Sequence, residues 1–492
     1  MVINNDFFIN NLREDKVNSM RIAIAYGLRI SILLYTLAHI IYSFSEHPQL
    51  LQVLSISGIA MIVFALLSIP ISDLKLPIFI LIIATTILLF ADANPLYGLF
   101  VGAREMRNII GLLVVIPLIK WVLQEENYVE DMMSVFNKFI NTSKKFYFSL
   151  VSLTQILAYF LLFASIPTMY QLTDVFFKDR KVDMWEYYKG TALLRGFSLS
   201  TLWVVTIPSF IVVVDTLNAS IYLSIAQGFG IALVGTLIAV LFMALEERRR
   251  DVKLTPIIQE EMDHILLDAS TDEKAKKKNV IEFILLFVSL FGTIFLIYGI
   301  WNIPLLILIP LVIIVWMFFF YIYKQRTYKF KMIAQQYLSE GLKNQTSSLV
   351  LMLIIGVLIY SLNQTNFAVN VVEGINTLES YVSWLNPLYL LPFIVIILGM
   401  LGLGPLTVMV LVAGILNSLS LPYPPELIVL AITSGSVISI LISPLILPLI
   451  VLSAANGLSS FTNGVKFNWK FGLVFYIVTQ IYIQIMVQFI VN

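Results

Sequence analysis

Two long segments of this sequence contain almost no charge. Between residues 196 and 245 the only Asp, Glu, Lys, Arg or His is Asp215, and between residues 380 and 465 the only one is Glu426. Soluble domains carry charge much more densely, because about a quarter of their residues are charged. The two segments therefore predict helices that are surrounded by lipid or by other apolar helices.

The composition of the whole chain agrees with a membrane environment. Of its 492 residues, 59% are hydrophobic and only 12% are charged. A helix needs about 20 mostly apolar residues to cross the hydrocarbon layer, and we expect an all-α polytopic membrane protein with about 11–13 transmembrane segments. Complete spans are predicted at residues 51–71, 146–170, 221–245, 280–300, 304–323 and 471–491. Residues 22–43 are expected to form a further span, with a partly interfacial helix as the alternative because Arg29 and His39 lie inside the run. The apolar runs at 76–91, 108–122 and 349–362 are shorter, which is typical of tilted, broken or re-entrant helices.

Residue usage argues against several classes of site. Cysteine is absent, so there is no disulfide or thiolate metal centre, and the three histidines at 39, 47 and 264 are scattered. The formal net charge is +1, which gives no indication of a nucleic-acid partner. No Walker-type phosphate loop is present, and an ATP-driven pump is not indicated. We expect no metal and no cofactor, with Na⁺ as a possible coupling ion.

Charged linkers divide the chain. We predict N-terminal membrane segments in residues 1–107, a first repeat in 108–245, a linker in 246–279, a connecting span in 280–303 and a second repeat in 304–492. Basic clusters at 248–250 and 274–278, and a basic stretch at 324–343 that holds Lys324, Arg326, Lys329 and Lys331, place the linker and this later stretch in the cytoplasm under the positive-inside rule. The relative orientation of the two repeats is left open, although many transporters invert one of them.

The proposed repeat rests on two similar runs, residues 195–201 and 402–407. Aligning Gly196 with Gly402 also aligns Thr201 with Thr407. Glycine, proline and hydroxyl residues at these places predict helical hairpins or broken helices, whose freed amides suit an anion and whose freed oxygens suit Na⁺. The predicted substrate-binding residues are Arg195, Ser198, Ser200, Thr201, Gly402, Gly404, Pro405, Thr407, Ser434, Ser436 and Ser443. Small residues also permit close helix packing, and for any single serine that interpretation is favoured.

Isolated polar residues in the apolar segments have two readings each. Arg195 either pairs with a carboxylate or phosphate of a substrate or extends to the membrane interface. Asp215 is a candidate for ion coupling, with helix capping as the favoured alternative, and Gln227 is a second coupling candidate. Glu426 follows three prolines and is expected to begin a helix at the surface.

Short motifs between residue 195 and residue 471 resemble those of poorly characterised bacterial members of the ion transporter superfamily. They are the Arg-Gly-Phe run at 195–197, the Gly-Leu-Gly-Pro run at 402–405, the Ile-Ser-Pro run at 442–444 and the Phe-Asn-Trp-Lys-Phe run at 467–471. The resemblance extends from residue 189 to the C-terminus. It implies a two-repeat, elevator-type transporter in which residues 198, 200, 201, 404, 405 and 407 line the site. The Ser-Asn-Thr hairpin tips of dicarboxylate carriers in that superfamily are missing, which argues against a dicarboxylate substrate.

These observations together predict a secondary active transporter in the bacterial cytoplasmic membrane. It would move a small organic anion by alternating access, coupled to Na⁺ or H⁺, with a homodimer as one possible assembly. An enzyme is not expected. The alternatives are a non-transporting protein of cell-envelope assembly and a membrane-embedded transferase.

Overall fold

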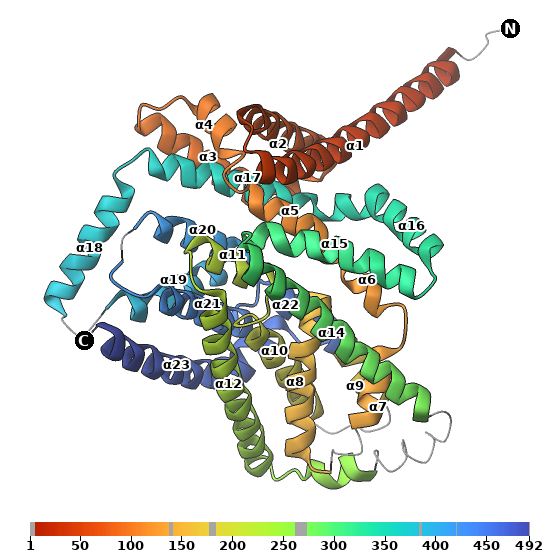
Figure 1. Ribbon diagram of the computed structural model, residues 1–492, viewed down its shortest axis with the longest axis vertical. Coiled ribbons are helices and arrows are strands. Elements are labelled where there is room, and N and C mark those ends of the chain that lie inside the picture. The colour runs from red at the N-terminus through yellow and green to blue at the C-terminus, as the bar shows by residue number, and fades with distance from the viewer. Residues whose placement is uncertain are drawn as a thin grey trace. The chain divides into compact units, whose positions relative to one another are not determined.

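The computed structural model describes residues 5–136, 141–176, 184–260, 273–382, 386–419 and 421–491 (Figure 1). Within these ranges all regular secondary structure is helical, which confirms the predicted all-α fold class. A helix satisfies the backbone hydrogen bonds within its own segment, which is required in the hydrocarbon layer of a membrane. The chain forms two compact units, residues 1–116 with 314–371 and residues 117–313 with 372–492.

The first unit pairs α1 with α2 and packs α17 against α3 and α4. Its helices are α1 (Asn5–Ser45), α2 (Pro48–Ser68), α3 (Ile71–Phe90), α4 (Pro95–Gly102), α5 (Arg107–Val115), α16 (Thr327–Gln336), the π-helical turn η4 (Tyr337–Gly341) and α17 (Leu342–Asn363). α17 approaches the end of α4 closely, since a Cβ at Gly102 would lie 2.4 Å from the Cα of Val357. Three elements run from one unit into the other: η1 (Ile116–Leu118), α15 (Leu305–Tyr323) and α18 (Phe367–Tyr381).

The second unit carries most of the charge-poor sequence. Its N-terminal helices are α6 (Lys120–Leu123), α7 (Tyr128–Phe136), α8 (Ser143–Leu161), η3 (Leu162–Ala164), α9 (Ser165–Phe176), α10 (Trp185–Ser200), α11 (Pro208–Thr216), α12 (Ile221–Arg249) and α14 (Glu273–Trp301). Its C-terminal helices are α19 (Pro387–Met400), α20 (Pro405–Asn417), α21 (Pro425–Ile442), α22 (Leu447–Asn456), the π-helical turn η5 (Thr462–Lys466) and α23 (Phe467–Val491).

Ten helices in the described part of the chain are long and apolar enough to cross a membrane. The pair Pro95–Gly102 and Arg107–Leu123, bent by 47°, would make an eleventh span and matches the interruption predicted at 108–122. Two other runs are full-length, contrary to expectation. The run at 76–91 belongs to Ile71–Phe90, which begins five residues earlier. The run at 349–362 belongs to Thr327–Asn363, in which the more polar residues 327–348 continue the helix before the apolar run.

Two broken helices occupy the interior of the second unit. α10 ends at Ser200 and α11 resumes at Pro208, while α21 ends at Ile442 and α22 resumes at Leu447. Both resumed helices begin after an extended isoleucine and carry a proline in their first two positions, where the missing N–H costs nothing. The alignment of Gly196 with Gly402 stays a prediction, and the similar breaks suggest a second pairing, of α10–α11 with α21–α22.

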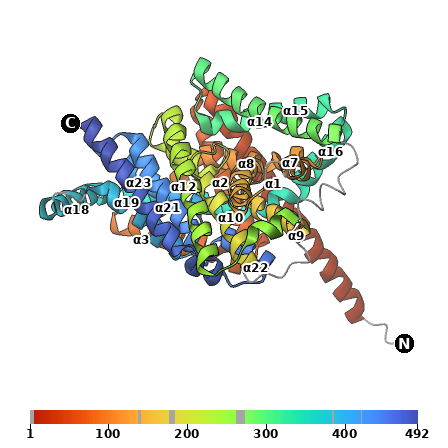
Figure 2. The same ribbon diagram turned by 90° about the horizontal axis from the view of Figure 1, so that it is seen from below.

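Similar neighbours surround the two broken helices. α10 packs against α8 and α12, and α21 packs against α19 and α23. Figure 2 shows α8, α10, α12, α21 and α23 within one group of helices. Because α10 also packs directly on α21 and α22, the two breaks belong to one helical core.

Candidate functional site

Arg195 lies at the centre of this core, on α10, and is completely buried. Its guanidinium donates from Nε to Asn468 Oδ1 at 2.9 Å and from one terminal nitrogen to the Tyr147 hydroxyl at 3.1 Å. Further donations reach the backbone oxygens of Ala239 at 3.5 Å and Phe467 at 3.3 Å. Helices α8, α10, α12 and α23 thus all contribute to the environment of this side chain.

All these acceptors are neutral, and no described Asp or Glu forms an ion pair with Arg195. The ring of Phe471 lies 4.6 Å from the guanidinium carbon and that of Phe242 lies 5.9 Å away, which stabilises the cation without neutralising it. A charge removed from water and left unpaired is costly, and in membrane proteins such a group marks a functional site by default. The Arg195 side chain does not reach the surface of the described structure.

A chain of amide side chains continues from Arg195. Asn468 donates to the backbone oxygen of Asn463 at 2.8 Å, and Asn463 exchanges hydrogen bonds with Asn456 at 2.8 and 3.0 Å. This chain faces α10 at Gly190, where a Cβ would lie 3.5 Å from Asn463 Oδ1 and 3.6 Å from Asn456 Nδ2. The site therefore joins α10 to the junction of α22 and α23.

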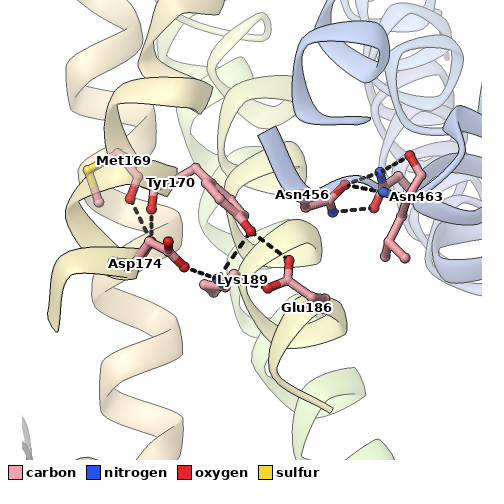
Figure 3. Close-up of polar contacts among 9 residues, drawn as sticks. Met169, Tyr170, Asp174, Glu186, Lys189, Asn456 and Asn463 are labelled. Carbon is pink, nitrogen blue, oxygen red and sulfur yellow. Dashed lines mark hydrogen bonds and ion pairs between the residues drawn. The ribbon is translucent and has the colours of Figure 1, made fainter. Parts of the chain in front are cut away.

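A second buried cation, Lys189, lies one residue before Gly190 (Figure 3). Its ammonium is 2.9 Å from Asp174, 2.8 Å from Glu186 and 3.3 Å from the Tyr170 hydroxyl, which in turn donates to Glu186 at 2.9 Å. The lysine side chain is 0% exposed, whereas those of Asp174 and Glu186 are 53% and 34% exposed. Lys189 is therefore compensated by carboxylates that reach solvent, in contrast to Arg195.

The predicted hydroxyl residues of α10 are satisfied within their own helix. Ser198 donates to Arg195 O at 3.0 Å, Ser200 to Phe197 O at 2.6 Å and Thr201 to Ser198 O at 2.7 Å. The helix does not break at Gly196, which lies where a Cβ would be 2.7 Å from Val151 O of α8. In this conformation Gly196 serves close packing, and the break follows Ser200.

The second predicted run does form a break. Gly402 has φ +91°, and α20 begins at Pro405 after Gly404. Thr407 is buried on α20, which packs on α11 and α21 rather than chiefly on α10. The two predicted runs are therefore carried by helices with different main neighbours.

The serines of α21 differ in their partners. Ser434 donates to Ala431 O of its own helix at 2.7 Å, and Ser443 donates to Gly399 O of α19 at 2.7 Å. The hydroxyl of Ser436 is buried and has no hydrogen-bond partner among the described residues. Of these three, Ser436 has a hydroxyl hydrogen that is not used in a described hydrogen bond.

Asp215 and Glu426 each bind the N-terminus of another helix. Backbone amides of Leu305 and Leu306, at the start of α15, hydrogen-bond to Asp215. Glu426 accepts from the amide of Ser220, the residue that caps α12, at 2.8 Å. A carboxylate at this position satisfies free amides and complements the helix dipole.

Gln227 lies on α12 with its side-chain oxygen buried and without a hydrogen-bond donor in the described structure, as is the hydroxyl of Ser224 one turn earlier. The next residue, Gly228, packs on the carbonyl oxygen of Leu202 in the α10–α11 break. Buried oxygens without donors therefore lie on the helix that packs on this break.

Sequence reasoning found Arg195 but missed its neighbours. Tyr147, Asn468 and Asn463 come from distant segments. Asn468 lies in the run at 467–471 that carries part of the resemblance but was not among the predicted site residues, and nothing in the local sequence marks Tyr147 or Asn463. Lys189 carried a usable signal, because Glu186 precedes it by one helical turn, a spacing typical of helical ion pairs.

No protein-family model matches this sequence, and no curated protein is significantly similar to it.

Proposed function

We propose that this multi-pass membrane protein is a secondary active transporter that moves a small organic anion across the cytoplasmic membrane by alternating access. The observation that carries the proposal is Arg195, a completely buried cation whose described partners are all neutral. An anionic substrate would supply the missing charge. The planar guanidinium is well suited to a carboxylate, which it binds through two parallel hydrogen bonds.

The paired broken helices support a transport role. In a membrane, helix breaks are tolerated where protein or a water-filled cavity satisfies the freed backbone groups, and transporters place substrate sites at such breaks. The breaks after Ser200 and Ile442 lie in helices that pack directly on each other. Substrate held by Arg195 would thus lie on α10, the helix that leads into the first break.

Coupling to a cation is the second part of the proposal. Ser224 and Gln227 offer buried oxygens that have no described donor, next to the residue that packs on Leu202 O. Oxygen ligands of this kind suit Na⁺. Replacement of Na⁺ by choline should therefore weaken anion binding, and Gln227→Leu should reduce that dependence.

The decisive experiment supplies Arg195 with an internal anion. In Asn468→Asp, the new carboxylate would lie 2.9 Å from Arg195 Nε. It would neutralise the positive charge that a substrate anion would otherwise neutralise. We expect wild-type protein to be stabilised against heat by at least one anion of a carboxylate and phosphate panel, and to accumulate it in liposomes under a Na⁺ or H⁺ gradient. The variant should lose both responses, at least tenfold in uptake. Its new ion pair with Arg195 opposes the loss of the hydrogen bond from Asn468 to Asn463 O, so its thermal stability should exceed that of a variant whose new carboxylate has no cationic partner.

Asn463→Asp is the matched control. Asn463 is equally buried, but its side-chain amide donates to Ser453 Oγ and Asn456 Oδ1, so a carboxylate there would have no guanidinium partner. This control should lose thermal stability because its new charge is unpaired. Full uptake by Asn468→Asp would contradict the role of Arg195 in binding the anion. Failure of every gradient and anion to drive uptake by the wild type would contradict a transport role.

A further inference from the structure

A basic cavity lies in the first unit, apart from the site around Arg195. Its volume is about 460 Å³, and it is bounded by α1, by the connection from α2 to α3 and by the start of α17. Three cationic residues line it: Arg21, Arg29 and Lys343. No Asp or Glu occurs among its described lining residues.

The three cations remain uncompensated. None of them forms an ion pair with another described residue, and Arg29 instead stacks on Tyr26, with its guanidinium carbon 5.5 Å from the ring centre. The Ser68 hydroxyl, also in the lining, is buried without a hydrogen-bond partner in the described structure. Three positive charges and an unused hydroxyl form a set suited to phosphate oxygens.

The remaining lining is aliphatic. Ile24, Leu28, Ile32 and Leu67 extend the cavity along α1 and α2. Arg21 and Arg29 are eight residues apart, which places them about 12 Å apart along the helix axis. The cavity therefore combines positive charges spread over more than two helical turns with an apolar wall. This combination is complementary to the anionic headgroup and the first methylenes of a lipid.

The position of the cavity favours the inner leaflet. Arg21 begins the first candidate span, Ser68 ends the second, and Lys343 belongs to the basic stretch that the positive-inside rule assigns to the cytoplasm. Anionic phospholipids are concentrated on the cytoplasmic face, and basic pockets between membrane helices bind their headgroups.

We propose that this cavity is a binding site for the phosphate group of an anionic phospholipid, whose acyl chain lies along Leu28, Ile32 and Leu67. A soluble phosphate compound would share the same headgroup chemistry. The apolar wall, and the position of Arg21 and Ser68 at the ends of two candidate spans, favour the lipid.

Native mass spectrometry of the full-length protein tests the site. Detergent-solubilised protein is supplied with equal amounts of phosphatidylglycerol and phosphatidylcholine, and the retained lipids are counted. We expect the wild type to prefer phosphatidylglycerol. Arg29→Gln and Lys343→Gln should each reduce that preference about fivefold, because each removes one charge near the headgroup.

Lys331→Gln is the matched control, because Lys331 belongs to the same basic stretch, on α16, and does not line the cavity. It should retain the wild-type preference. Equal retention of the two lipids by the wild type, or an equal loss in Lys331→Gln, would overturn the proposal. Displacement of phosphatidylglycerol by millimolar inorganic phosphate would assign the cavity to a soluble phosphate compound and overturn the lipid assignment.

Discussion

At the scale of single residues, the two acids of the charge-poor segments have a structural role in this conformation. Asp215 binds the start of α15, and Glu426 binds the amide of Ser220 at the start of α12. Each ties together segments that are far apart in sequence. Helix capping, the favoured reading of Asp215, describes its observed contacts, and the capped helix is a different one from its own.

Asp215 lies outside the candidate spans, and burial raises the pKa of its carboxyl from 3.8 to about 6, although the Leu305 and Leu306 amides oppose the shift. The folded protein therefore binds this proton more tightly than the unfolded chain does. Ionisation of Asp215 lowers the free energy of unfolding, so its contribution should become more favourable as the pH falls from 7 towards 4.

The test compares apparent melting temperatures of wild type and Asp215→Asn in detergent. Between pH 7 and pH 5 the wild type should gain stability relative to the variant. Between pH 7 and pH 8 the difference should stay constant, because the carboxyl is ionised throughout. Parallel curves over the whole range would show that Asp215 is not the titrating group.

Residues could be predicted from sequence only where the signal was local. Arg195 stood out because a cation beside a long apolar run is unusual. Its acceptors Tyr147 and Asn468 lie 48 and 273 residues away, and no spacing rule connects such distances. Serines 198 and 200 attracted attention by composition, but hydrogen bonds to their own helix occupy them here, as is common for serine in helices.

At the scale of helices, Gly402 is the residue on which the α19–α20 break depends. Its φ of +91° is disfavoured for residues with a Cβ. Gly402→Ala should therefore reduce the free energy of unfolding by about 1–2 kcal/mol. Thermal or denaturant unfolding in detergent measures this change.

Gly404→Ala provides the comparison, because Gly404 has φ −61° and no atom lies within 4 Å of a Cβ built there. It should change stability by less than about 0.5 kcal/mol. A loss in Gly404→Ala equal to that in Gly402→Ala would show that backbone conformation is not the cause.

Helix boundaries were predictable where apolar sequence and helix coincide. The predicted spans at 221–245 and 304–323 nearly match Ile221–Arg249 and Leu305–Tyr323. Hydropathy failed where polar residues continue a helix, as at Thr327–Asn363, because helical hydrogen bonding does not require an apolar side chain. Hydropathy also gave no indication that α10 passes through Gly196 intact.

At the scale of the whole molecule, the predicted sidedness can be checked directly because the chain has no cysteine. α14 and α15 form two successive spans joined near Asn302, an exposed residue, and Lys324 follows the second. A membrane-impermeant maleimide should label Asn302→Cys in intact cells. It should label Lys324→Cys only after the cells are made permeable.

The cysteine-free parent protein controls for background labelling. Reaction of Lys324→Cys in intact cells together with protection of Asn302→Cys would reverse the assigned orientation. That result would also move the Lys343 end of the basic cavity to the outer leaflet, where the proposed anionic lipid is less abundant.

Fold class could be predicted from the sequence because apolar composition indicates a membrane environment. In hydrocarbon only helices or closed barrels satisfy the hydrogen bonds of the backbone. The division into two units could not be predicted in this way. It places residues 314–371 with the N-terminal helices, and the repeats proposed at 108–245 and 304–492 stay a prediction. Helix partners of this kind depend on side-chain packing over hundreds of residues, which hydropathy does not encode.

The π-helical turn η5 has a consequence for how this site tolerates change in length. Its wide turn allows Asn463 to bond Asn456 while Asn468, five residues later, donates to Asn463 O and accepts from Arg195. Deletion of Val465 would tighten the turn and rotate the residues just before it by about 100° relative to α23. Asn463 would then face away from its partners, although none of the contacting side chains has been removed. We therefore expect the protein to tolerate substitutions in this turn better than the deletion of one residue.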